Sequence, residues 1–232
     1  LIQRAGDVIP EVVKVIKEKR SISSTPFLIP KKCPVCSGKV IRNDEEVVNR
    51  CSNDLCMAKI QGSIEHFVSK SCMNIDGLGT KIVELLIKEK KIIDFGDLYS
   101  LSFMDIVSLD RMGEKSAENI ISSINKSKKS TLARFINGLG IRNVGYNTAK
   151  ILENYFEGNI WKFMNATKEE LTNIHEIGDI MANSIMSYFS NCKQKDIILK
   201  CLNNGVMFKS LNKIKQSIIK DQIFVFTGNL VS

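Results

Sequence analysis

The sequence predicts a mainly α-helical protein, preceded by a small cysteine-rich knuckle and a short β-strand region. Three observations support this fold class. From about residue 63 to residue 208, apolar residues recur at three- and four-residue spacing, as in residues 82–86. Within that stretch, a glycine-containing turn repeats at a nearly constant interval. Before it stand four cysteines, at positions 33, 36, 51 and 56, arranged as two closely spaced pairs.

The composition limits the possible functions but does not identify one. The chain has 232 residues, 44% of them apolar, and a formal charge of +8, which allows packed cores and favours an anionic partner such as nucleic acid. Aromatic residues make up only 7%, which argues against a broad platform for stacking single strands. We find no membrane-length apolar run and no signal-peptide pattern at the N-terminus, so we expect no membrane partner.

The chain divides into six segments by composition. Residues 1–19 read as a strand whose Pro10 suggests a sheet edge, and residues 20–32, with two prolines, read as a linker. Residues 33–62 hold the four paired cysteines, and residues 63–208 form the helical region. Residues 209–221 are a basic connector, and residues 222–232, which begin with QIFVFTGNL, resemble a first strand. Since no initiator Met is present, we expect a piece of a longer protein.

The helical region contains a fourfold repeat. The repeated element is an apolar residue followed by glycine and then a helix-like stretch, at Gly79, Gly113, Gly145 and Gly178. The intervals are 34, 32 and 33 residues, and in three repeats an alanine stands four positions after the glycine. Ankyrin and tetratricopeptide arrays have a similar period, but their signature residues are missing. A single glycine turn only joins two helices, whereas four copies indicate a structural motif with a repeated role.

Such a turn can bind an anion, because the first backbone amides of a helix have no partner within the helix. A dinucleotide is disfavoured, because Gly77 and Gly79 lack the third glycine of the dinucleotide fingerprint and no convincing strand precedes them. The Gly-Lys-Ser/Thr ending of a phosphate-binding P-loop is also missing.

The four paired cysteines predict a structural zinc site. CPVC supplies Cys33 and Cys36, and CSNDLC supplies Cys51 and Cys56. Four thiolates close a tetrahedral zinc shell and leave no open position for catalysis. A redox pair or unlinked thiols are the alternatives, and the second cysteine pair disfavours them. We expect Cys72, Cys192 and Cys201 to be buried apolar residues, and His66 to have a structural role.

The order of these motifs resembles one family. RAGDVIP, the cysteine knuckle, HFVSK…MNIDGLG, GEKSAENI, GIRNVGYNTAKIL and FVFTGNL follow one another as in the C-terminal half of bacterial-type NAD-dependent DNA ligases. The resemblance implies the end of an oligonucleotide-binding (OB) β-barrel, a four-cysteine zinc finger, a DNA-binding domain of four helix-hairpin-helix motifs and the start of a BRCT domain. It places residues 1–19 in the OB remnant and residues 222–232 in the truncated BRCT domain.

The resemblance also implies the activity of the full enzyme. Such ligases seal 3′-hydroxyl/5′-phosphate nicks in duplex DNA during replication and repair, using NAD, Mg²⁺ and a lysyl-AMP intermediate. The Lys-x-Asp-Gly motif of the adenylation domain does not occur in this sequence, so we assign no catalytic or NAD-binding residue and expect this chain alone to be inactive. We expect a monomer in the bacterial cytosol, with zinc as its own cofactor.

On this resemblance the turns bind DNA phosphates through backbone amides and nearby cations. The expected DNA-binding residues are Gly77, Gly79, Lys81, Arg111, Gly113, Lys115, Arg142, Asn143, Gly145 and Gly178. For each cation, a solvated surface charge is the alternative interpretation. Glu176 would place a carboxylate near a phosphate, so the fourth turn is expected to bind weakly. We further expect Gly79 to need the positive φ that glycine tolerates.

Other functions stay open at the level of sequence. A non-catalytic zinc and helix-hairpin-helix module of DNA repair would share the middle of the chain, but would not need RAGDVIP before it or FVFTGNL after it. A protein-interaction hub would make the positive charge incidental. A decayed ligase gene would look the same, and only the full reading frame distinguishes it.

Overall fold

The computed structural model describes residues 1–6, 9–42 and 48–209, so most of the predicted connector 209–221 and the predicted BRCT strand 222–232 lie outside the described residues. The chain forms two compact units, Leu1–Asp54 and the part that begins at Leu55. In the described part, strands pair only as three separate two-stranded sheets, and the remaining regular structure is helical. The prediction of a mainly helical protein is therefore confirmed.

The first unit contains two short antiparallel pairs. Strand β1 (Ile2–Ala5) pairs with β2 (Ile9–Val12), and Arg4 lies opposite Pro10. The predicted single strand over residues 1–19 is thus a hairpin followed by a 3-10 turn at Lys17–Lys19, because Gly6, with φ 61°, lets the chain reverse. Strand β3 (Val40–Ile41) pairs with β4 (Arg50–Cys51) within the knuckle.

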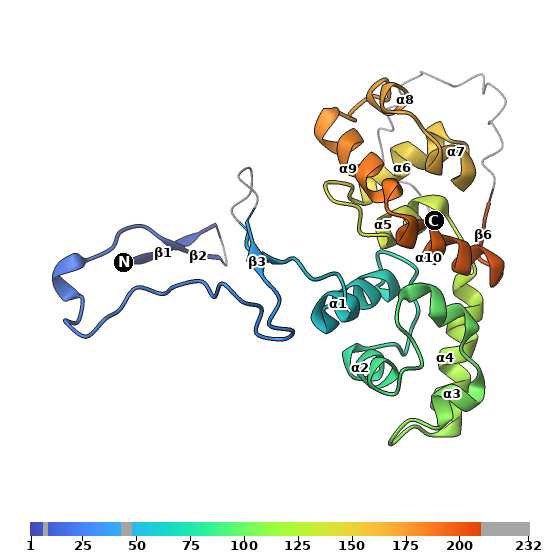
Figure 1. The fold of residues 1–232 in the computed structure, drawn as a ribbon, viewed down its shortest axis with the longest axis horizontal. Coiled ribbons are helices and arrows are strands. Elements are labelled where there is room, and N and C mark those ends of the chain that lie inside the picture. The colour runs from blue at the N-terminus through green and yellow to red at the C-terminus, as the bar shows by residue number, and fades with distance from the viewer. Residues whose placement is uncertain (7–8, 43–47, 210–232) are drawn as a thin grey trace, which may run out of the picture. The chain divides into compact units, whose positions relative to one another are not determined.

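The second unit is built from helices joined by short turns (Figure 1). Its first elements are α1 (Met57–Val68), α2 (Thr80–Lys88), the 3-10 helix η2 (Phe95–Ser100), α3 (Phe103–Val107) and α4 (Glu114–Ser127). They are followed by β5 (Lys129–Ser130), α5 (Leu132–Gly138), α6 (Tyr146–Tyr155), α7 (Ile160–Met164), α8 (Lys168–Thr172), α9 (Asp179–Ser190), α10 (Cys192–Asn203) and β6 (Met207–Phe208). Helix α1 begins inside the segment 33–62 that was predicted as the zinc finger.

Four helix pairs recur along this unit. Helix α1 packs against α2, α3 against α4, α5 against α6, and α8 against α9. Each pair is joined through one of the predicted glycine turns, since Gly79, Gly113, Gly145 and Gly178 are the N-cap residues of the second helices. The fourfold repeat therefore corresponds to four helix-hairpin-helix elements.

One apolar core joins these pairs. The ring of Phe67 on α1 stacks on Phe95 of η2, with 4.3 Å between ring centroids, and meets Tyr99 and Phe135 edge-on. Near the C-terminal end, the Nζ of Lys200 on α10 lies 2.7 Å from Asp94 and 2.9 Å from Asp97. Strand β6 pairs in parallel with β5. Residues far apart in sequence therefore share one core, which holds the hairpins on a rigid base.

Within the described residues, we find no helix with the length and apolar character needed to span a membrane.

Candidate zinc site and nucleic-acid interface

The four predicted cysteines come together in the cysteine knuckle, residues 33–56. Cys33 and Cys36 flank a tight turn before β3, Cys51 ends β4, and Cys56 is the N-cap residue of α1. All four sulfur atoms lie within 4.8 Å of one another, and the Sγ atoms of Cys36 and Cys51 are 3.4 Å apart. The chain thus brings four sulfurs to one point, as a tetrahedral metal site requires.

The turn between the first two cysteines is fixed by its backbone. The N–H of Cys33 donates to the carbonyl of Gly38 at 2.7 Å, and the N–H of Ser37 donates to the carbonyl of Cys33 at 2.8 Å. A Cβ atom on Gly38 would come within 3.2 Å of the Cys36 sulfur and 3.1 Å of the Cβ of Asn53. Glycine at position 38 therefore leaves room for the sulfurs to converge.

The chemistry of the cluster suits a soft divalent cation. The backbone at Cys36 and then at Val35 lowers the pKa of the Cys33 thiol. The pKa of Cys51 rises to about 11, because burial and the sulfurs of Cys36 and Cys33 outweigh the opposite effect of the backbone at Asn53. Several crowded thiolates repel one another unless a cation neutralises them, and zinc does this with four sulfur ligands.

The four turns share one backbone geometry. We define hairpin 1 as residues 75–79, hairpin 2 as 109–113, hairpin 3 as 141–145 and hairpin 4 as 174–178. In hairpins 2, 3 and 4 the N–H of the fourth residue donates to the carbonyl of the first, at 3.0 to 3.1 Å. In all four, the third residue has positive φ: Gly77 (90°), Arg111 (59°), Asn143 (61°) and Glu176 (70°). Positive φ at the third position of a turn is the pattern of a type II turn.

This geometry corrects one expectation. The positive φ belongs to Gly77 and its equivalents, whereas Gly79 has φ −76° and ψ 170°, an extended conformation that any residue adopts. Gly77 is also constrained by packing, since a Cβ there would lie 2.7 Å from the Cγ1 of Ile120 on α4. Because Gly79 is the helix N-cap residue rather than the turn residue, its backbone follows the extended path of an N-cap.

Neither backbone strain nor packing against the described residues requires glycine at the four N-cap positions. A Cβ on Gly79, Gly113, Gly145 or Gly178 would meet no heavy atom within 4 Å in the described part of the chain. Their φ values lie between −76° and −91°. No side chain caps the first-turn amides of these four helices in the structure as described. The space beside each N-cap glycine is thus open, and the first-turn amides of each second helix have no side-chain cap.

Charged side chains differ among the hairpins. Lys81 and Lys115 are exposed two positions after the N-cap glycine, and Arg142 is exposed in hairpin 3. The exposed side chain of Arg111 lies 3.6 Å from Asp110. Acidic residues occupy the first turn after hairpin 2, at Glu114, and after hairpin 4, at Asp179, whereas α2 and α6 have none there.

Hairpin 4 is the most acidic of the set. It carries Glu176, whose Oε1 lies 3.7 Å from the Nδ1 of His175, and Asp179 follows it directly in α9. The nearby Lys168 is engaged with Asp179, at 3.0 Å. This environment repels an anion more than the environment of hairpins 1 and 3 does.

Sequence reasoning missed one feature of hairpin 3. Tyr146 is the first residue of α6 and is exposed, and the Nζ of Lys150 lies 4.7 Å from the centre of its ring. The two residues are four apart and so share one face of the helix. Their position directly after the glycine of the repeat was the available signal.

The remaining cysteines and histidine lie outside the zinc cluster. His66 places its Nε2 2.7 Å from the carbonyl of Asn137, which supports its predicted structural role. Cys72 and Cys201 are buried as expected, but Cys192 is exposed, because it is the first residue of α10. Cys72 has polar neighbours that the sequence did not predict: the Nδ2 of Asn137 lies 3.1 Å from its sulfur.

The fold and the two sites define a class of protein: a cysteine-type zinc finger followed by a helix-hairpin-helix array. The NAD-dependent DNA ligase C4 zinc finger domain matches residues 32–58, and the helix-hairpin-helix motif matches residues 134–198, which include hairpins 3 and 4. The structure shows the same geometry in hairpins 1 and 2, which that motif does not cover.

Whole-sequence similarity identifies the family. The chain is 46% identical to the DNA ligase of Clostridioides difficile (strain 630), 45% to that of Lysinibacillus sphaericus (strain C3-41) and 43% to that of Anoxybacillus flavithermus (strain DSM 21510 / WK1). These matches cover 99% to 100% of this chain and 34% to 35% of the relatives, so the chain spans about a third of their length. It belongs to the bacterial NAD-dependent DNA ligases, as the portion with the zinc finger and helix-hairpin-helix regions. The prediction of zinc is confirmed for this site.

Proposed function

We propose that this chain is the DNA-holding part of a ligase that seals 3′-hydroxyl/5′-phosphate nicks in duplex DNA. The observation that carries the proposal is the set of N-cap glycines. Neither backbone conformation nor packing against the described residues calls for glycine at these positions, and each stands before uncapped helix amides. A missing side chain at such a place leaves room for a ligand to approach the amides closely.

A DNA phosphate fits this site. The amides at a helix N-terminus donate hydrogen bonds to phosphate oxygens, and the helix dipole adds a favourable field. Such contacts hold the sugar–phosphate backbone and do not distinguish bases. A ligase acts on nicks in any sequence, so sequence-independent binding is what its DNA-holding part requires.

Hairpins 1 and 3 are the stronger phosphate sites in this proposal. They lack an acidic residue in the first helical turn, and Lys81 and Arg142 supply charge beside them. Hairpin 2 combines Arg111 and Lys115 with the opposing Glu114. Hairpin 4 binds least, because Glu176 lies in its turn and Asp179 lies in the first turn of the following helix.

The chemistry of sealing belongs to other parts of the enzyme in this proposal. NAD, Mg²⁺ and the adenylated lysine act outside these 232 residues, and the zinc site, with four sulfur ligands, has a structural role. The protein works as a monomer in the bacterial cytosol. With NAD labelled in its adenylate half, this chain should form no labelled protein, and an AMP adduct on one of its lysines would refute that assignment.

Duplex binding measured over a series of salt concentrations tests the DNA-holding role. Gly79→Ala should keep the fold and weaken binding about tenfold, roughly the loss of one hydrogen bond to a charged group. The salt dependence should change little, because no cation is removed. Lys115→Ala should instead reduce the slope of log affinity against log salt by about 0.9, the value for one phosphate contact on duplex DNA.

Gly178→Ala is the matched control for Gly79→Ala, since it makes the same change at the same place in the acidic hairpin. It should alter binding less than about twofold, because little binding energy is expected at that hairpin. If folded Gly79→Ala binds like the parent while Gly178→Ala abolishes binding, the assignment of hairpins is wrong.

A further inference from the structure

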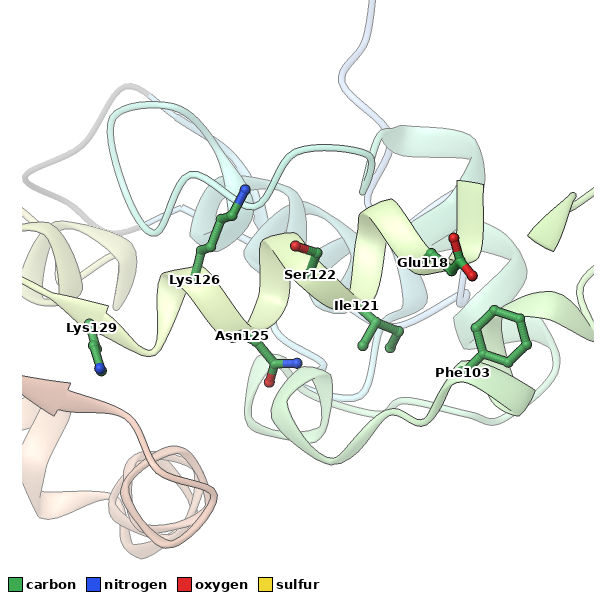
Figure 2. A pocket seen from close by; sticks show the side chains of 7 residues that line it. All are labelled: Phe103, Glu118, Ile121, Ser122, Asn125, Lys126 and Lys129. Atoms are coloured by element: carbon green, nitrogen blue, oxygen red, sulfur yellow. The ribbon is translucent and has the colours of Figure 1, made fainter. Parts of the chain in front are cut away.

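Helix α4 has one face that the described part of the chain leaves uncovered. Ala117, Ile120 and Ile124 are buried in the core. On the opposite side, Glu118, Ser122 and Asn125 are exposed. This outer face and the adjoining α3 form an open groove of about 740 Å³ (Figure 2). Nothing in the DNA-holding role of the hairpins makes use of it.

The groove has three chemically distinct parts. Glu118 lies at the end nearer the start of α4. The middle is apolar, where the side chains of Ile121 and Phe103 face each other in Figure 2; both are partly buried against the core. Lys126 and Lys129 line the far end. A ligand that matches this order carries an apolar group and, beyond it, negative charge.

The basic end is not neutralised by the residues that the structure describes. Lys126 and Lys129 are exposed, and neither forms an ion pair with another residue that the structure describes. Lys128 adds a third cation between them in sequence. The residues Ser122 and Asn125 beside the apolar centre offer hydrogen-bonding groups to a peptide backbone.

We propose that this groove is a docking site for an acidic peptide segment of a partner protein, anchored by one aromatic or large aliphatic side chain. Lys126 stands five residues after Ile121, about 7.5 Å along the helix axis and about 140° around it, so the two side chains leave different sides of α4 (Figure 2). A bound peptide therefore crosses the exposed face of α4, over Ser122 and Asn125, before its acidic residues reach the lysines. Since an extended peptide advances about 3.3 Å per residue, the acidic residues follow the anchor after at least two positions.

Duplex DNA is a poorer occupant than a peptide. Lys126 lies thirteen residues after Gly113, about 20 Å along α4 from the hairpin 2 amides. The carboxylate of Glu118 stands between them and repels phosphates. A phosphate backbone also has no group that uses the apolar surface of Phe103 and Ile121. A partner could thus bind this groove while the hairpins hold DNA.

The test uses the synthetic peptide Gly-Phe-Gly-Asp-Asp-Gly and the isotope-labelled chain, followed by amide NMR shifts. Shifts should concentrate at Ile121, Asn125 and Lys126, with a dissociation constant near or below about 1 mM, the weak end of recognition. The double variant Lys126→Glu/Lys129→Glu should weaken binding about fivefold or more, and the same peptide with Lys in place of Asp should not bind.

The matched control is Lys88→Glu/Lys193→Glu, which changes the net charge equally at exposed sites outside the groove. It should leave peptide binding unchanged. Equal weakening by both double variants would mean non-specific attraction and would overturn the proposal, as would the lack of localised shifts at several millimolar peptide.

Duplex DNA binding separates this proposal from the DNA-holding role. Lys126→Glu/Lys129→Glu should bind duplex within about twofold of the parent, while Lys115→Ala changes the salt slope. If the groove variant loses duplex affinity and the peptide causes no shifts, the groove is a DNA surface and the docking proposal is wrong. If every hairpin variant still binds DNA like the parent and the peptide still binds the groove, only the DNA-holding role is refuted.

Discussion

The cysteine knuckle and the helix-hairpin-helix unit are stabilised by different means. Among the residues of the knuckle that the structure describes, the buried apolar ones are the ligands Cys33 and Cys56 themselves, while Val35 and Leu55 are 58% and 69% exposed. In the helical unit, one continuous core runs from Ile64 to Val206. The knuckle therefore depends on its metal, because so short a segment buries too little apolar surface to fold alone.

This difference teaches how each site is held in place. In the knuckle, the metal ligands hold the backbone in place without an apolar core. In the helical unit, each hairpin is held in place because both of its helices pack against the core. Metal loss should consequently act locally, and core mutations should act on the whole helical unit. Substitutions in each region test whether metal loss acts locally and core mutations act on the whole helical unit.

The largest effect should come from the loss of a zinc ligand. Cys51→Ser should reduce zinc from about one per chain to nearly none, because structural zinc contributes roughly 10 kcal/mol or more to such sites. Metal analysis measures the zinc, and circular dichroism should show that most helix remains. Cys192→Ser, a change outside the cluster, should retain full zinc. Zinc at full occupancy in Cys51→Ser would refute the ligand assignment.

A core truncation tests the other side of the comparison. Phe67→Ala should lower the free energy of unfolding of the helical unit by about 3 to 5 kcal/mol, since it removes a fully buried ring. Urea unfolding measures this change. Without denaturant, the zinc content should stay that of the parent. Ile180→Ala, at a position that is 70% exposed, should change stability by less than about 0.5 kcal/mol. Zinc loss in folded Phe67→Ala would show that the two regions are coupled.

The hairpins combine packing with function, and Gly77→Ala separates the two. The alanine would have to adopt positive φ, and its Cβ would press on Ile120. Gly77→Ala should therefore lower the free energy of unfolding by roughly 2 kcal/mol. Gly79→Ala should lower the thermal midpoint less, since it loses only the N-cap preference for glycine over alanine. The opposite ranking of these two variants in thermal unfolding would mean that the turn and N-cap positions have been exchanged.

The smallest effect concerns the N-terminus of α3. Asp105 Oδ2 accepts a hydrogen bond from the hydroxyl of Ser102 at 2.6 Å, and Lys91 lies 2.9 Å from its Oδ1; these contacts lower the pKa of Asp105 to about 2. A lowered pKa in the folded state adds stability above the unfolded pKa near 4, and this stability is lost as the pH falls towards 2.

Asp105→Asn should therefore cost at most about 1 kcal/mol at pH 7, since the pair is partly exposed. The difference from the parent should shrink as the pH falls from 4 to 2, which urea midpoints at several pH values would measure. A cost that stays constant over this range would assign the effect to lost capping geometry rather than to charge.

Local patterns in the sequence predicted much of this protein. The spacing of Cys33, Cys36, Cys51 and Cys56 predicted the metal cluster, because the ligands of a zinc knuckle are close in sequence. The recurrence of an apolar residue and glycine predicted four turns before helices, since a turn and a helix start involve only neighbouring residues. Both features lie at the scale of a few residues, where chain connectivity limits the geometry.

By itself, the sequence determined the ligand set, the number of hairpins and the helical class. Only the tertiary structure decided that Gly77 rather than Gly79 takes positive φ, that Ile120 packs against it, and that the N-cap glycines face open space. It also decided that Cys192 is exposed while Cys72 is buried. The reason is physical: these properties depend on which distant helix packs against a residue, and such contacts have no signature in local spacing.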